Sequence, residues 1–419
     1  MTGLFSFVAS EPEKAVFVSD PKDGELAAQA IPMLHAMGRK VALIDDFGVR
    51  PELAAYRIEL NAFGSTASAY LRDPSLLIYV NEMVSHSLIE EPPDQDMRNF
   101  YYRHSPRTLI EFANSVSLKR DPNLAAPGAV AALVSDLDML TTYAEIEAEE
   151  GDPALKAAAR GVLEMRNHEH FQQHVGEAAR ALRHFGPGTK LQDAGRDAQI
   201  SHEDLIREGY VVFLAGPQAL MSKLGSYYAL HTGGFVQAIY RNIGPLRIIG
   251  DEFTNSPLKL MIEAISTVRA FGGEYHLIAQ SHSEVLRKYG EHLTQTVEDN
   301  SITKQWIGGL GSFTEADRIS KAMGDQHALA TALSGENGSI KTNTNLSLIK
   351  QRHMTAAELM SLPADQAVCH VKGVGFFVHR TLSQANLAPF CSEITENPLE
   401  GGRLPPDPKI TLTTPGAAT

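Results

Sequence analysis

The sequence predicts an α/β protein in which a doubly wound, mostly parallel sheet is interrupted by an all-α domain. Short apolar runs recur near the beginning and in the second half of the 419-residue chain, as is typical of parallel strands buried on both faces. Amphipathic helical sequence lies between most of these runs. From about residue 97 to residue 201 the strand signal almost disappears, and apolar residues recur with the period of a helix.

Composition indicates a soluble globular protein, since 43% of residues are hydrophobic and 21% are charged. No apolar run approaches the roughly 18 residues of a membrane span, and no signal peptide opens the sequence. Cys369 and Cys391 are the only cysteines, which excludes a disulfide framework and suits a reducing cytoplasm. The net charge of −13 argues against a uniformly basic nucleic-acid surface but allows a local basic path.

The first unit is a strand, a helix and a second strand. Residues 15–20 (AVFVSD) are apolar and β-branched, and residues 25–38 form an amphipathic helix that ends at Gly38. Residues 40–48 (KVALIDDFG) predict the second strand, which ends in Asp45 and Asp46. A helical crossover between two apolar runs indicates a parallel pair, with functional residues at the carboxyl ends.

Four later runs are assigned to the same sheet: residues 209–216, 246–252, 275–281 and 304–309. Three long helical stretches precede them, at residues 107–118, 128–150 and 154–185. After a short helix from Thr355, residues 366–380 predict a hairpin that turns at Lys372 and Gly373.

The expected domains are four. They are a first part of the α/β core (1–96), an inserted all-α domain (97–200), the remainder of the core (201–380) and a flexible Pro- and Gly-rich tail (381–419).

The run LRIIGDEFTN, from Leu246 to Asn255, ends an apolar strand in two adjacent carboxylates. One interpretation is a nucleotide-hydrolysing site, in which Asp251 holds Mg²⁺ through water and Glu252 prepares the attacking water. The alternative is a strand that ends in a solvated acidic turn. The residues of this run alone do not decide between the two.

A longer pattern carries a resemblance. Residues 248–309 resemble the type IV secretion coupling proteins, the conjugation ATPases that hand DNA or protein to a secretion channel. In that family a strand ends in Asp-Glu, a helix ends in Arg before a Gly-rich turn, and the next strand ends in Gln-Ser. Residues 16–48 resemble the family's Asp-Pro-Lys-Gly-Glu segment and its following strand. The matching positions here are Asp251, Glu252, Arg269, Gly272, Gly273, Gln280, Ser281, Tyr289, Gly290 and Asn300.

The resemblance implies a RecA-like nucleotide-binding core with an inserted all-α domain, working with ATP and Mg²⁺. It implies a hexameric ring at the cytoplasmic face of the bacterial inner membrane. The ring would deliver single-stranded DNA, or a relaxase or effector protein, to the type IV secretion channel. Two alternatives stay open: a non-catalytic adaptor fragment that recognises cargo and binds no nucleotide, and a DNA translocase of the FtsK or HerA kind.

The resemblance also implies roles for individual residues. Asp251 would hold Mg²⁺ and Glu252 would orient water. Gln280 would sense the γ-phosphate, or it is an exposed turn amide. Arg269 would reach into the nucleotide of a neighbouring subunit, or it is a cation at a helix C-terminus. Asp20 and Lys22 are expected to form a turn near the nucleotide, in a loop (DPKDGE) one residue longer than the family pattern.

One family motif is missing. No G-x-x-x-x-G-K-[ST] occurs in the sequence, and GPGTK (186–190) lacks its spacing and reads as a loop. Thr2 and Gly3 stand where the residues after the loop's Lys would be, so we expect the chain to begin inside the phosphate-loop helix, without an upstream membrane anchor. Because that loop supplies the backbone donors and the Lys for the phosphates, ATP hydrolysis by the chain alone is expected to be very weak.

Three further patterns favour ordinary structure. His170 and His174 have an i, i+4 spacing that zinc can use, but with His168 they are expected to form a solvated polar face. Basic residues in 116–122 and 352–359 form only small patches, which suit a lined pore or an ordinary surface. Trp306 is expected to pack in the core rather than against a base.

Overall fold

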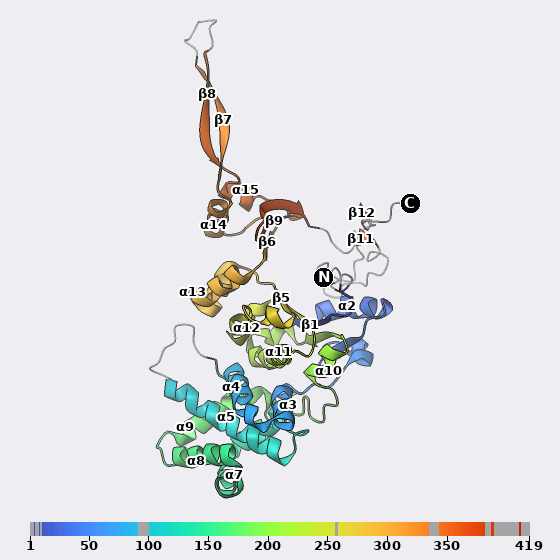
Figure 1. Cartoon of the computed structure of the whole chain (residues 1–419), viewed down its shortest axis with the longest axis vertical. Helices are drawn as coiled ribbons and strands as arrows, with labels where there is room; N and C mark the ends of the chain where they lie inside the picture. Colours follow the sequence, from blue (N-terminus) through green and yellow to red (C-terminus); the bar gives the residue numbers. More distant parts are fainter. Residues whose placement is uncertain are drawn as a thin grey trace.

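The computed structural model describes Leu4, Val8 and residues 11–90, 100–255, 259–334, 343–381, 387–388 and 410–411. Figure 1 shows an elongated molecule with a helical block at one end, an α/β core in the middle and a projecting two-stranded ribbon at the other end. The tail predicted at 381–419 lies almost entirely outside the described residues. Within them, none of the helices combines the length and the hydropathy that crossing a membrane requires.

The core sheet has five parallel strands in the order β2-β3-β1-β4-β5. Every residue of β1, β3 and β4 is buried, as continuously apolar strands require. The predicted parallel sheet is confirmed for these five strands. Their bounds are β1 (Ala15–Asp20), β2 (Val41–Ile44), β3 (Val211–Ala215), β4 (Leu246–Gly250) and β5 (Gly273–Leu277).

Helices cover both faces of this sheet. Helix α2 (Glu25–Ala36) packs on the face formed by Val16, Val18 and Phe213. Helix α11 (Gly225–Tyr240) packs on the opposite face, where the rings of Phe17 and Phe235 lie 4.3 Å apart. The core is therefore doubly wound, as predicted.

The strand predicted at residues 304–309 was wrongly assigned to this sheet. Strand β6 (Thr303–Ile307) pairs antiparallel with β9 (Gln366–Val371) in a separate three-stranded sheet. Its residues alternate between exposed and half-buried, which suits a sheet with one solvated face. The predicted hairpin is confirmed, because β9 pairs with β10 (Gly375–Arg380) across a turn that contains Gly373.

This second sheet has a small core of its own. Helices α14 (Phe313–Met323) and α15 (Ala356–Met360) bury Ile319 and Leu359 against it. Trp306 is half-buried in the same cluster, so it packs in a core as expected. Beyond it, β7 (Asp325–Ser334) and β8 (Asn343–Arg352) form an antiparallel ribbon that the sequence did not predict. Figure 1 shows this ribbon projecting away from the rest of the chain.

The described part of residues 97–200 forms helices and turns without a strand. The helical block includes two helices that precede residue 97, because α4 packs along α5. Its apolar interior is continuous with the sheet face that α11 covers. The block consists of α3 (Gly64–Arg72), α4 (Leu77–Leu88), α5 (Phe100–Arg120), α6 (Pro127–Ser135), α7 (Leu137–Glu150), α8 (Pro153–Arg166) and α9 (Phe171–Ala181).

The chain leaves the core for the helical block and returns to it at one place. It leaves after β2 and re-enters through β3, which is the neighbour of β2 in the sheet. Outgoing and returning segments touch, since a Cβ at Gly195 would lie 2.4 Å from the Cα of Asn61. Only a residue without a side chain fits there, and Gly195 also has a φ of +69°.

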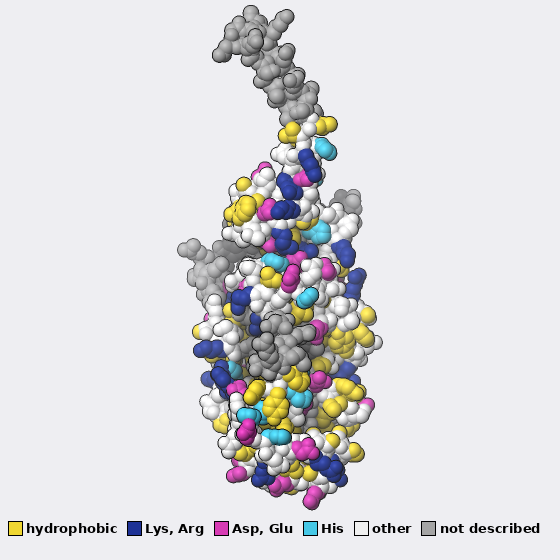
Figure 2. All heavy atoms as spheres, turned by 90° about the vertical axis from the view of Figure 1, so that its left-hand side faces the viewer, with side chains coloured by type: hydrophobic (Ala, Val, Ile, Leu, Met, Phe, Trp, Pro, Cys, Tyr) yellow, Lys and Arg dark blue, Asp and Glu magenta, His cyan; other side chains and the backbone are white. Residues whose placement is uncertain are grey.

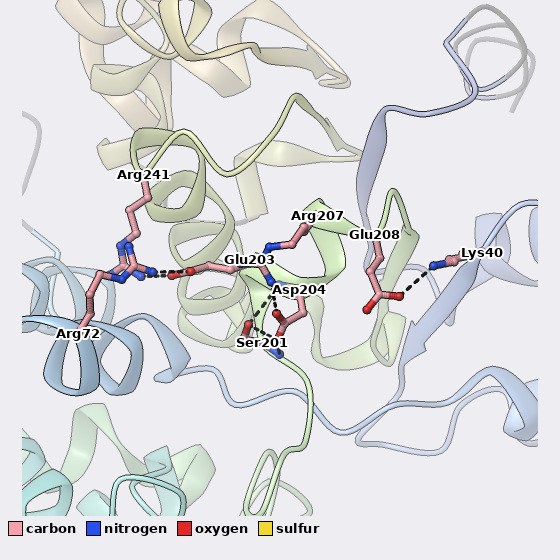
Figure 3. A network of polar contacts seen from close by, with 8 residues as sticks. All are labelled: Lys40, Arg72, Ser201, Glu203, Asp204, Arg207, Glu208 and Arg241. Atoms are coloured by element: carbon pink, nitrogen blue, oxygen red, sulfur yellow. Dashed lines mark hydrogen bonds and ion pairs between the residues drawn. The ribbon is translucent and has the colours of Figure 1, made fainter.

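A polar network fastens the returning segment (Figure 3). Glu203 of α10 (His202–Arg207) is 6% exposed and accepts hydrogen bonds from Arg72 at the end of α3 and Arg241 just after α11. Ser201 and Asp204 form a capping box at the start of α10. Helix α10 thereby ties the helical block to the helix on the core sheet.

Candidate functional site

The site lies at the carboxyl edge of the central strands. Asp251 and Glu252 follow β4 directly, and Gln280 follows β5, the next strand in the sheet. Pairing continues past the strand ends, because the Phe253 amide donates to the carbonyl of Ile278 at 3.1 Å. On the other side the Asp251 amide donates to the carbonyl of Ser19, in β1, at 3.3 Å. In open α/β sheets this edge is where ligands bind.

The turn after β4 has an unusual backbone. Glu252 has a φ of +50°, in the left-handed region that costs a residue with a side chain about 1–3 kcal/mol. The surroundings hold this conformation, since the Tyr289 hydroxyl of α13 (His282–Asn300) donates to the carbonyl of Phe253 at 3.0 Å and the two rings stack. The backbone therefore aims the Glu252 side chain across the end of the sheet.

Two side chains contact the carboxylate of Glu252, which is 5% exposed. Gln280 Nε2 donates to Glu252 Oε1 at 2.8 Å. Lys22 Nζ lies 2.7 Å from the same oxygen and 3.7 Å from Asp251 Oδ2. The structure therefore brings Asp251, Glu252 and Gln280 together and adds a lysine between the two acids.

Electrostatics separate the two carboxylates. Burial acts to raise the pKa of Glu252, but hydrogen bonds from Lys22 and Gln280 outweigh it, so the pKa is lowered. Burial raises the pKa of Asp251, against the attraction of Lys22. At neutral pH Glu252 is thus an ionised acceptor that an amide already orients.

Lys22 reaches the acids because its loop is fastened to the end of β3. The Asp23 amide donates to the carbonyl of Gly216 at 3.0 Å, and Asp23 Oδ1 accepts from the Gln218 amide at 3.0 Å. Asp23 and Gly24 both have positive φ, 52° and 65°, which accommodates the long DPKDGE loop. We expected Lys22 to serve only as a turn residue. Its contact with the acids depends on β1 being the neighbour of β4, which the sequence did not predict.

Asp20 lies at the end of β1 and is fully buried. Its Oδ2 accepts a hydrogen bond from the Ala27 amide at 2.8 Å, while Oδ1 has no partner within the described residues. Burial, with the nearby charge of Asp251, raises the pKa of Asp20 to about 7. A third carboxyl group therefore stands behind the acid pair, and it retains its proton below about pH 7.

These oxygens fit a magnesium ion that is shared with phosphate. Mg²⁺ prefers oxygen ligands and is usually held by one or two carboxylates together with substrate phosphates. In the described ranges no group of three or more His, Cys, Asp or Glu side chains is placed to hold a metal by itself. Asp251, which is half-buried, is the side chain that suits the one-carboxylate arrangement.

Arg269 lies apart from the acids. It is exposed in the turn of residues 268–271, just before β5 begins, and Gly272 packs on Pro245 at the start of β4. The five residues of β5 span about 16 Å. Arg269 precedes this strand and Gln280 follows it, so the two residues lie at opposite ends of the strand. Within one chain Arg269 does not reach the acid pair.

Two other predicted features, the histidine face and the loop at residues 186–190, are not part of the acid-pair site. His174 is fully buried, with its ring 4.7 Å from that of Tyr101, so the expected solvated face is wrong for this residue. It lies on the inner face of α9, where the period of the helix turns it toward α5. Residues 186–190 form a turn after α9, as expected of a loop.

Comparison with known proteins gives two kinds of match. A family model described as the TraM recognition site of TraD and TraG matches residues 245–364, the region that contains Asp251, Glu252, Arg269 and Gln280. Comparison with curated sequences finds no significant match.

Solved structures of plasmid coupling proteins share the fold. The unbound bacterial conjugative coupling protein TrwBdeltaN70 superposes with a TM-score of 0.58 at 14% identity, over 89% of this chain and 85% of that one. TrwB in complex with the non-hydrolysable GTP analogue GDPNP gives 0.59 at 13%, over 89% and 86%. TrwB in complex with ADP and Mg²⁺ gives 0.57 at 13%, over 89% and 86%. The core is thus a RecA-like α/β fold with an all-α insertion, as predicted.

Proposed function

We propose that this chain, a type IV secretion coupling protein by its TraD and TraG region and its fold, is the motor part of a coupling ATPase. It would deliver DNA or protein substrate to a channel at the inner membrane. One observation carries the proposal: an ionised Glu252 bound to Gln280, beside Asp251, at the carboxyl ends of neighbouring parallel strands. This arrangement suits hydrolysis of a nucleoside triphosphate better than it suits an ordinary acidic turn.

The chemistry follows from the charges and contacts. Glu252, with its pKa lowered, would accept a proton from water and hold that water in line for attack. Gln280 donates to Glu252 at 2.8 Å and would keep that carboxylate oriented while it senses the γ-phosphate. Asp251 would hold Mg²⁺ through water. Mg²⁺-ATP, when bound, supplies the transferable phosphoryl group.

Lys22 adds a residue to this proposal. Its ammonium group lies between the two carboxylates, where it balances charge that a divalent cation would otherwise balance. Before nucleotide binds, Lys22 would act as a positioning residue for the acid pair. With Mg²⁺ and phosphate bound, its ammonium group would contact the phosphate oxygens instead, because a divalent cation beside it repels it.

Arg269 supports a ring. Arg269 is exposed at the end of the strands opposite the acids, so it cannot contact the nucleotide of its own chain. In a ring, Arg269 of one copy could contact the nucleotide bound to the neighbouring copy. Arginine suits that task, because its planar guanidinium is always charged and can bond phosphate through two donors. We propose a hexamer in which Arg269 acts in trans and the helical block faces relaxase, effector or single-stranded DNA cargo.

The experiment measures nucleotide binding and turnover on the full chain. We expect Mg²⁺-dependent ATP binding that Asp251→Asn weakens at least tenfold, while Glu164→Gln, an exposed acid of α8, leaves it unchanged. Because the sequence contains no glycine-rich GK[ST] loop, turnover by the chain alone should be very slow, and Glu252→Gln should slow it further.

Two results contradict this proposal. Fast turnover that Glu252→Gln abolishes would show that hydrolysis needs no such loop. Absence of Mg²⁺-dependent ATP affinity would favour the alternative, a cargo-recognition adaptor that binds no nucleotide. An FtsK- or HerA-like translocase is disfavoured by the helical insertion.

A further inference from the structure

A pocket separate from the acid pair lies where the helical block meets the core. It has a volume of about 460 Å³ and is lined by the end of α4, the start of α5, the end of α9, the first turn of α11 and Lys288 of α13. None of the acid-pair residues lines it. We propose that this pocket binds a small phosphorylated anion, in the size range from pyrophosphate to a nucleoside diphosphate.

The lining is strongly cationic for a chain of net charge −13. Five lysines and arginines face two glutamates. Each glutamate already pairs with one of the cations, Glu177 with Arg180 at 3.6 Å and Glu90 with Lys288 at 3.7 Å. The five cations are Arg103, Arg180, Arg183, Lys223 and Lys288.

Among the described residues, two of these cations have no acidic partner. Arg183 and Lys223 form no ion pair within the part of the chain that the structure describes, although both line the pocket. Burial, and then the charges of Arg183 and Lys223, lower the pKa of His184, which lines the same wall. Their positive charges therefore act on one shared space, where a bound anion would relieve the repulsion.

The start of α11 adds backbone donors. Gly225 and Ser226 line the pocket, and none of the side chains that the structure describes caps this end of the 16-residue helix. The first amides of an uncapped helix point outward and carry its positive dipole end, which favours phosphate. The hydroxyl groups of Ser222 and Ser226 are further donors in the lining.

Size and shape favour a small ligand over a polymer. A volume of about 460 Å³ lies in the usual range for small-molecule sites. The tetrahedral oxygens of phosphate match donors that converge from several elements, whereas a peptide carboxylate would engage fewer of them. On the face shown in Figure 2, Lys and Arg side chains are interspersed with acidic, histidine and hydrophobic ones. A ligand here would bind the helical block and the core at once.

The test is isothermal titration of the full chain with sodium pyrophosphate and, separately, with adenosine diphosphate. Both titrations contain EDTA and little salt, so that the acid pair cannot bind through Mg²⁺. We expect binding that Arg183→Glu and Lys223→Glu each weaken at least tenfold. The matched control is Arg160→Glu, an exposed arginine of α8, which should bind as tightly as the unaltered chain. Glu252→Gln should also bind normally, which separates this pocket from the proposed hydrolytic site.

Each outcome decides the proposal. Tighter binding of adenosine diphosphate than of pyrophosphate would assign a nucleotide ligand, and equal binding would assign the free phosphate compound. No binding at 1 mM of either compound would overturn the proposal, as would equal weakening by Arg160→Glu. Binding of a single-stranded oligonucleotide but of neither small anion would also overturn it. If a reversed charge disturbs folding, Lys223→Gln is the substitute, and retained affinity in that variant counts against the pocket.

Discussion

Replacing Asp20 by Asn should stabilise the protein more as the pH rises. In the folded chain the pKa of Asp20 is raised from 3.8 to about 7, chiefly by burial. Between these values the folded state keeps a proton that the unfolded state has lost, so the free energy of unfolding falls as the pH rises and levels off above about 7. Three pKa units at about 1.4 kcal/mol each amount to roughly 4 kcal/mol.

Asparagine removes that pH dependence while keeping an oxygen for the Ala27 amide. We therefore expect Asp20→Asn to gain about 3 kcal/mol over the unaltered chain between pH 5 and pH 8, with no further gain above pH 8. The lowered pKa of His202, about 3 in the fold because of burial, weakens both proteins equally as the pH falls below about 6.5. It cancels in the difference.

Urea unfolding followed by circular dichroism from pH 5 to pH 8.5 measures both curves. Asp193→Asn is the matched control, because this aspartate is exposed in an ion pair with Arg196 and its replacement should change neither stability nor slope. A loss of stability that is equal at every pH would refute the reasoning, since it would mean that Asp20 is ionised in the folded protein.

Two further predictions concern the fold around the site. Glu203→Gln leaves Arg241 without its buried counter-charge and should lower the free energy of unfolding by about 3 kcal/mol. Arg72→Gln removes the half-exposed partner of the same glutamate and should lower it by less than about 1 kcal/mol. Equal losses in urea titrations would contradict this difference. Gly24→Ala places a Cβ 3.0 Å from Arg50 Cγ at a φ of +65° and should lower the melting temperature more than Gly38→Ala, where φ is +78° but no atom lies within 4 Å. Similar melting temperatures would show that the loop shifts freely.

The central strands could be predicted because strands buried on both faces consist of consecutive apolar residues. Residues 15–20 and 211–215 are buried throughout. Their prediction therefore did not require deciding which side chains face the core and which face solvent. Strand β6 could not be assigned in the same way, because Trp306 and Ile307 resemble the end of an apolar run while their neighbours are polar. Its antiparallel partner lies about 60 residues later in the chain, and only tertiary contacts bring the two together.

The ribbon and the lysine of the site were missed for different reasons. Residues 325–334 (DQHALATALS) are rich in alanine and leucine, which favour helices, and cross-strand pairing overrides that preference. Lys22 has no local signal, since its contact with Glu252 depends on the order of strands in the sheet. Asp251 and Glu252 could be singled out because they directly follow a recognisable strand, whereas Gln280 was singled out by the resemblance to the coupling proteins.

The side-by-side exit and entry of the helical block, at Asn61 and Gly195, has an evolutionary consequence. Both ends of the inserted chain stay at one point, so helices far from the core, such as α7 and α8, can change in length without altering the path of the strands. Helix α4 packs against α11, so a change there would also alter the core.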